Sequence, residues 1–98
     1  MIVKGSELPA SDHGRKLYPL TSHEIAGQHF ATWATTPDHP FPSHKHEQRE
    51  LWFIMEGQAI ATLDGQEHLV ESGDLIELAP WVEHGLRTDT RVKWICMG

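Results

Sequence analysis

Turn-forming residues divide this chain into short segments, and their spacing constrains the fold more than any other sequence feature. The segments are rich in β-branched and aromatic residues or alternate between apolar and polar, with turn signals every 8 to 12 residues or so. None shows the 3.6-residue apolar period of an amphipathic helix. The expected strands are 1–4, 27–35, 50–56, 58–63, 66–70, 75–78, 84–88 and 91–97. This pattern predicts an all-β fold, a small antiparallel barrel or sandwich.

Local signals fix three of the connections. Asp64-Gly65 separates two of the expected strands, and this dipeptide is the strongest short-range signal for a β-hairpin. Gly57 ends the strand 50–56, so we expect it to adopt a positive φ that other residues resist. Residues 36–42 contain Pro37, Pro40 and Pro42, so we expect an irregular loop there.

Potential metal ligands follow this proline-rich loop. His44 and His46 are two residues apart, so in extended backbone they project to the same side and can reach one ion together. Glu50 has the same parity, and His84 comes at the end of a separate apolar segment. In a chain with eight histidines a His-x-His pair alone arises by chance about 0.6 times, so only the combination with Glu50 and Gly57 is informative.

Residues 38–88 resemble the two motifs of the cupin superfamily, in their usual order and at about their usual separation. The four metal-ligand positions of those motifs hold His44, His46, Glu50 and His84. The resemblance implies a jelly-roll-like cupin β-barrel formed by residues 25–98, preceded by strands and loops in 1–24, as one domain over 1–98. It also implies one divalent transition-metal ion per chain.

The sequence departs from the family motifs at three places. Asp38 stands where the family usually has its first glycine, and Thr88 stands at the position of an asparagine. Ala79-Pro80-Trp81 replaces Pro-x-Gly. None of these positions is a ligand, so the departures concern loop geometry rather than metal binding.

The donor set indicates the kind of chemistry. Three imidazoles and one carboxylate suit Fe, Mn, Ni, Cu or Zn, and the spacing does not distinguish these ions. On a six-coordinate ion four ligands leave two adjacent positions open, as a catalytic metal requires. We therefore expect a metal-dependent enzyme acting on an oxygen-bearing small molecule, and the cupin resemblance implies a reaction of oxygenase, isomerase or lyase type. The alternatives are a non-catalytic binding or sensory module that holds its ligand through the metal, and a metal that only stabilises the barrel.

Two further residues are candidates for catalysis. His29 alternates with Ala31 and Trp33, so it becomes an acid–base candidate if that face points inward. Trp52 lies on the ligand side of its strand. The expected inner face has no obvious Arg or Lys, which favours an apolar or aromatic substrate; it comprises Trp33, Trp52, Ile54, Leu86 and Trp94.

Other notable side chains have simpler interpretations. We expect Cys96 to be a small core residue, and Phe41 to line the mouth of the site. His13, His23 and His68 are expected at the surface.

Composition restricts the partners. The net charge is −6 and no basic cluster exceeds Arg15-Lys16, which disfavours nucleic acid. There is no apolar run of membrane-spanning length and no secretory pattern at the N-terminus, so we expect a cytoplasmic protein with no membrane partner. A chain of 98 residues buries only about 65% of its unfolded surface, so we expect a homodimer to supplement a modest core.

Overall fold

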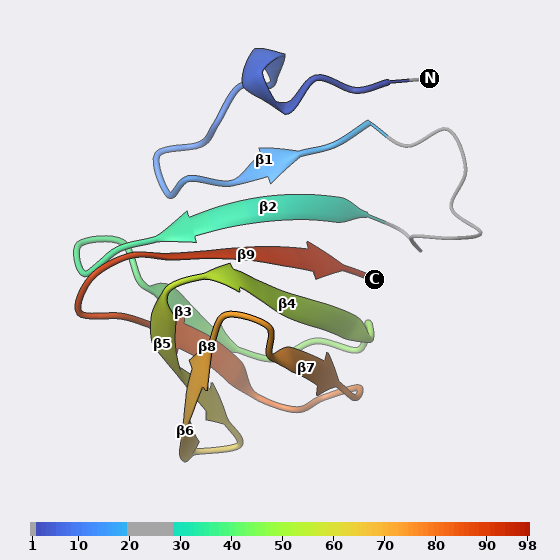
Figure 1. The fold of residues 1–98 in the computed structure, drawn as a ribbon. Helices are drawn as coiled ribbons and strands as arrows, with labels where there is room; N and C mark the ends of the chain where they lie inside the picture. Colours follow the sequence, from blue (N-terminus) through green and yellow to red (C-terminus); the bar gives the residue numbers. More distant parts are fainter. Residues whose placement is uncertain (1, 20–28) are drawn as a thin grey trace.

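The computed structural model describes residues 2–19 and 29–98, which form nine β-strands and one short 3-10 turn (Figure 1). The elements are η1 (Gly5–Glu7), β1 (Lys16–Leu17), β2 (Phe30–Thr35), β3 (Phe41–His44), β4 (Glu50–Glu56), β5 (Gln58–Leu63), β6 (Gln66–Glu71), β7 (Leu75–Leu78), β8 (His84–Arg87) and β9 (Val92–Met97). The predicted all-β class is confirmed. Among the described residues, no helix has the length and apolar character needed to cross a membrane.

The strands form two antiparallel sheets. The five-stranded sheet has the order β1-β2-β9-β4-β7, and the four-stranded sheet has the order β3-β8-β5-β6. Because each strand alternates its side chains between two faces, each sheet turns one apolar face inward. The core between them is fully buried at Trp52, Ile54, Ala61 and Trp94.

The strand register aligns the inward residues of the five-stranded sheet. Cys96 of β9 lies opposite Ala31 of β2 on one side and opposite Trp52 of β4 on the other. Trp94 lies opposite Trp33 of β2 in the same way, and these two indoles stack with centroids 5.4 Å apart. The sequence therefore predicted the inward faces of these three strands correctly.

Both turn predictions are confirmed. Asp64 and Gly65 have φ of 48° and 81°, and they connect β5 to β6, whose residues pair along their whole length. Gly57 has φ of 91° between β4 and β5. A Cβ atom at Gly57 would lie 2.2 Å from the carbonyl oxygen of Arg91, so this position excludes side chains for steric as well as conformational reasons.

Two predictions about the first half of the chain are wrong. Residues 36–42 are not wholly irregular, because β3 begins at Phe41 and includes Pro42. Proline is tolerated there because β3 is an edge strand and its missing N–H leaves no ladder bond unmade. Residues 2–4 form no strand, because strand propensity without a pairing partner does not make a sheet.

The predicted strand 27–35 begins at Phe30 in the described part of the chain. Residues 27–28 of this prediction, and His23, lie outside the described residues.

Candidate metal site

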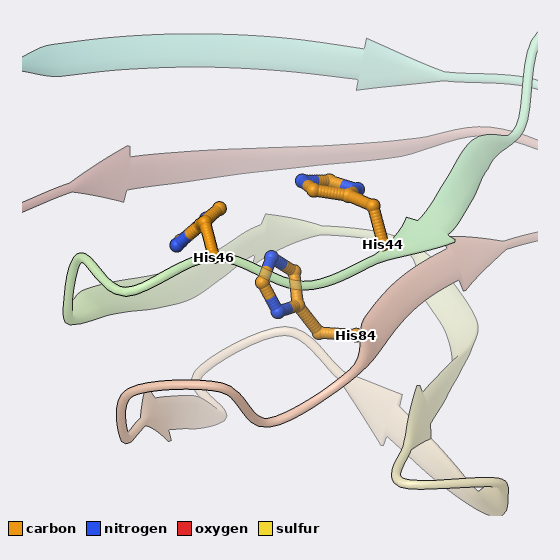
Figure 2. Close-up of side chains that lie close together, drawn as sticks. All are labelled: His44, His46 and His84. Atoms are coloured by element: carbon orange, nitrogen blue, oxygen red, sulfur yellow. The ribbon is translucent and has the colours of Figure 1, made fainter.

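Three histidines converge between the two sheets (Figure 2). His44 ends β3 and lies directly opposite His84, the first residue of β8, so pairing of these strands brings the two imidazoles together with centroids 4.5 Å apart. His46 follows in the loop that leads to β4. Each of the three offers one nitrogen, and these nitrogens all lie within 4.8 Å of one another. The pair predicted from spacing and the histidine from the distant segment thus meet at one point.

Hydrogen bonds to the backbone orient two of the imidazoles. Nδ1–H of His44 donates to the carbonyl oxygen of Pro42 at 2.9 Å, and Nδ1–H of His84 donates to that of Val82 at 2.8 Å. Since a carbonyl oxygen only accepts, Nδ1 carries the hydrogen in both residues and each Nε2 keeps a lone pair. This is the arrangement in which imidazoles bind metal ions.

Nε2 of His84 is buried without a hydrogen bond in the described part of the chain. The residue is 1% exposed, and its Nε2 has no hydrogen-bond partner among the described residues; the same holds for Nδ1 of His46. Buried polar atoms are normally satisfied because an unmet one costs about 1–3 kcal/mol. A metal ion would satisfy Nε2 of His84, so the residues present fit the ion that the cupin resemblance implies.

Burial also keeps His84 neutral. It lowers the pKa of the imidazole below its ordinary value of 6.5, and the neighbouring His44 and His46 act in the same direction. The hydrogen bond to Val82 and the charge of Glu50 oppose this effect without cancelling it. A neutral imidazole is the form that binds a metal ion.

Glu50 lies beside the three imidazoles. Its carboxylate is 3.5 Å from Nε2 of His46 and 3.8 Å from Nε2 of His84. The buried indole N–H of Trp52 donates to Oε1 of Glu50 at 3.2 Å, so Trp52 holds the carboxylate in place. Within the histidine set, all ligand atoms lie within 4.8 Å of one another. Glu50 is not part of that compact set, and its carboxylate instead forms an equally compact set with His29 and Cys96.

His29, Glu50 and Cys96 form a second cluster on the five-stranded sheet. Nε2 of His29 lies 3.3 Å from Sγ of Cys96 and 3.6 Å from Oε2 of Glu50. The pKa of the Cys96 thiol is raised from 9.0 to about 12, mainly by burial, and the charge of Glu50 and a hydrogen bond to Glu50 act in the same direction. Cys96 is buried as expected, and its thiol also faces the site, because the face of β9 that carries Cys96 points inward.

Phe41 packs against the site rather than standing apart from it. Its ring is 4.9 Å from that of His44 and 4.9 Å from that of Trp33, and it meets Trp52 and Trp94 edge-on at 5.3 Å each. Phe41 thus lies beside a ligand, while its expected place at the mouth of the site stays a prediction. Its ring joins the histidines to the tryptophan core.

Arg15 is the basic residue that sequence reasoning missed. Its guanidinium lies 5.6 Å from the centroid of the Trp33 ring. The positive charge of Arg15 also lowers the pKa of Cys96, against the larger effect of burial. Gly14 permits this approach: its φ is 73°, and a Cβ there would lie 2.6 Å from the carbonyl oxygen of Ala34. The expected inner face has no Arg or Lys of its own, but the N-terminal segment folds back onto β2 and places Arg15 beside one residue of that face, Trp33.

The remaining histidines of the described chain are at the surface. His13 and His39 are exposed, with ring centroids 5.0 Å apart, and His68 is exposed on β6. The surface predictions for His13 and His68 are confirmed.

Two departures from the cupin motifs have structural explanations. Trp81, at the usual glycine position, keeps the glycine-like backbone with φ of 66°, and its N–H donates to the carbonyl oxygen of His46 at 2.8 Å. Thr88, at the usual asparagine position, is buried and its hydroxyl donates to the carbonyl oxygen of Gln58 at 2.7 Å. The loop at Trp81 is thus hydrogen-bonded to the backbone of His46, and Thr88 is hydrogen-bonded to the start of β5.

Comparison with known proteins identifies the family. A family model described as "Cupin domain" matches residues 32–98. A gentisate 1,2-dioxygenase from Streptomyces sp is 29% identical over 102 residues, a match that covers 93% of this chain and 28% of that enzyme. This chain therefore spans little more than a quarter of that relative.

Solved structures agree on the fold. An RmlC-like cupin from Shewanella frigidimarina has a TM-score of 0.82 at 20% identity, covering 97% of this chain and 86% of that chain. A predicted oxalate decarboxylase from Thermotoga maritima has a TM-score of 0.76 at 22% identity, covering 99% and 96%. With the family model matching more than half of its length, this chain belongs to the cupin family.

Proposed function

We propose that this cupin binds one divalent transition-metal ion through His44, His46, His84 and Glu50, and uses it to act on an oxygen-bearing small molecule. The observation that carries the proposal is the convergence of three imidazole nitrogens within 4.8 Å, one of them a buried Nε2 without a partner. The donors are nitrogen and oxygen, so Fe, Mn, Ni, Cu and Zn are all suitable.

The bound ion would supply Lewis acidity and, if redox-active, electron transfer. The chain's own residues have separate roles. His29 has a partly exposed side chain beside Glu50, which makes it the candidate to accept or donate a proton. Trp52 is fully buried, so we assign it the positioning of the Glu50 carboxylate rather than contact with substrate.

The substrate class follows from the site and one relative. A molecule with two neighbouring oxygens would use the open positions of a six-coordinate ion. The gentisate dioxygenase relative supports an oxygenase reaction. Arg15 beside Trp33 adds a cation over an aromatic ring, so a flat substrate with an anionic group fits better than a purely apolar one.

The test begins with untagged protein loaded anaerobically with Fe, Mn, Ni or Cu. Candidate catechols and diketones are added, and O2 uptake is measured. We expect uptake with at least one metal and substrate, loss of uptake in His84→Ala, and unchanged uptake in His39→Ala, which alters an exposed histidine on the preceding loop. Absence of uptake with every metal would contradict the oxygenase reaction.

The alternative is a non-catalytic binding or sensory module with the same metal site. It predicts that a small molecule co-purifies with the metal-loaded protein and is released unchanged. Mass spectrometry of the released molecule before and after exposure to O2 separates the two: turnover supports the enzyme, and tight retention without turnover supports the module.

We also propose that the chain self-associates through the outer face of the five-stranded sheet. Phe53 and Leu75 are register partners on β4 and β7 and are 40% and 60% exposed; Met55, on the same face, is 40% exposed. Large apolar side chains grouped in this way are typical of interaction surfaces. Light scattering should give the mass of a dimer, and Phe53→Glu should give that of a monomer.

A further inference from the structure

The two sheets present different donor atoms to the space between them. The three histidines come from β3, β8 and the loop after β3, all on the side of the four-stranded sheet. His29, Glu50 and Cys96 come from the facing sheet. The three histidines and Glu50 belong to the cupin motifs of this sequence. His29 and Cys96 do not.

Adjacent strands explain why the second group meets. Cys96 lies on β9, between β2 and β4, and points inward opposite Ala31 and Trp52. His29 is two residues before Ala31, and Glu50 is two residues before Trp52, so both share the inward parity. Backbone hydrogen bonds between His29 and Gly98 extend the β2–β9 ladder past Phe30 and fix His29 at this end of the sheet.

The resulting cluster has the composition and compactness of a metal site. Its nitrogen, oxygen and sulfur donors all lie within 4.8 Å of one another, with Sγ of Cys96 only 3.3 Å from Nε2 of His29. A set with one sulfur, one nitrogen and one carboxylate favours thiophilic ions such as Zn(II) and Co(II) over the hard ions.

We propose that His29, Glu50 and Cys96 form a second metal-binding site, selective for a thiophilic divalent ion and separate from the three-histidine site. The Glu50 carboxylate has two oxygens and lies between the two sets, so it can serve both. This inference goes beyond the proposed function and does not require it. An ion at this site would hold His29 as a ligand, so the proton-transfer role proposed for His29 applies to the protein with this second site empty. On binding, the Cys96 S–H bond breaks, a sulfur–metal bond forms, and the proton leaves to solvent.

Burial explains why the thiol is inert until an ion arrives. In the metal-free protein Cys96 is 5% exposed, so its thiol is shielded from solvent. A divalent cation changes this, because a coordinating thiol is deprotonated by the charge of the ion. We therefore expect release of one proton per ion bound at this site near neutral pH.

A cobalt titration tests the proposal without reference to activity. Reduced, untagged, chelator-treated protein is titrated with Co(II) while the near-ultraviolet thiolate-to-cobalt charge-transfer band and the bound equivalents are recorded. We expect two equivalents and a thiolate band in the wild type. Cys96→Ala should lose the band and one equivalent, and Cys96→Ser should also lose the band. His84→Ala should keep the band and lose the other equivalent.

Each other result has a definite meaning. If the wild type binds one equivalent of Co(II) without a thiolate band, and His84→Ala binds none, the second site is overturned and the proposed function stands. One equivalent with a band that survives in His84→Ala supports the second site and overturns the three-histidine site. One equivalent lost in both variants overturns the claim that the sites are separate. Thermal melts of the metal-free variants establish that each one folds.

Discussion

The two facing sheets contribute donor sets that differ in how they are assembled. The set on the four-stranded side consists of His44, His46 and His84, of which two are neighbours in sequence and two are opposite each other in the β3–β8 pair. The set on the five-stranded side brings together His29, Glu50 and Cys96 from three segments that adjoin only in the folded sheet.

The two sets also differ in how their polar atoms are satisfied. Within residues 2–19 and 29–98, the histidine set leaves Nε2 of His84 and Nδ1 of His46 buried without hydrogen-bond partners. In the other set the side chains contact one another, and Trp52 donates to Glu50. The histidine set is thus the one that most needs an ion, and the other set is stable without one.

The largest expected effect comes from removing a ligand of the histidine set. His84→Ala should weaken binding of the first metal ion by at least about 100-fold, because it removes the most buried imidazole of the three. Metal content of purified protein and calorimetric titration measure this. His39→Ala, an exposed histidine, is the matched control and should bind like the wild type. Equal metal content in the two variants would contradict the assignment of His84 as a metal ligand.

Glu50→Gln tests whether the carboxylate serves both sets. We expect metal affinity to fall by about 10- to 100-fold at each, because the substitution keeps the shape but removes the negative charge beside His29, His46 and His84. Competition against a chelator of known affinity gives the two constants. A loss confined to one set would assign Glu50 to that set alone.

The stability of the metal-free protein should depend on the two sets at opposite ends of the pH range. Burial lowers the pKa of His84, so the unfolded state binds more protons below about pH 6.5 and stability falls as the pH drops through the lowered pKa. Burial raises the pKa of Cys96 from 9.0 to about 12, so the folded state holds the proton longer and stability falls as the pH rises through this range.

Urea denaturation across pH checks both limbs. His84→Gln should flatten the acid limb relative to the wild type and leave the alkaline limb unchanged, and Cys96→Ala should do the reverse. If the free energy of unfolding of the two variants had the same pH dependence, the burial of His84 and Cys96 would not explain the loss of stability in acid and in alkali.

The smallest effect concerns the loop beside the histidine set. Trp81 has φ of 66°, which is strained for a bulky residue. Trp81→Gly should stabilise the protein by about 1 kcal/mol, or raise the melting temperature by about 4 to 8 °C, in a thermal melt. Trp81→Ala keeps a Cβ and should gain little. Metal affinity should be unchanged in both, since Trp81 contacts His46 through its backbone.

Sequence was informative where the structure is local. The Asp64-Gly65 hairpin, the positive φ of Gly57 and the proximity of His44 to His46 all depend on residues close together in the chain. The meeting of His84 with this pair was predictable only through the family motifs.

The parts that sequence reasoning missed depend on long-range packing. The thiol of Cys96 reaches the site because β9 lies between β2 and β4, an order that no spacing reveals. Arg15 reaches Trp33 because Gly14 lets the N-terminal segment press onto β2. The edge position of β3 likewise explains why Pro42 does not prevent a strand.

The position of a bound metal ion tests most directly whether His44, His46 and His84 form the metal site. A crystal of the protein loaded with one equivalent of metal, with data collected at the absorption edge of that metal, gives an anomalous peak wherever the ion lies. We expect a peak about 2.0 to 2.3 Å from imidazole nitrogens of His44, His46 and His84. A peak only at surface histidines such as His13 and His39, or none near His84, would contradict it.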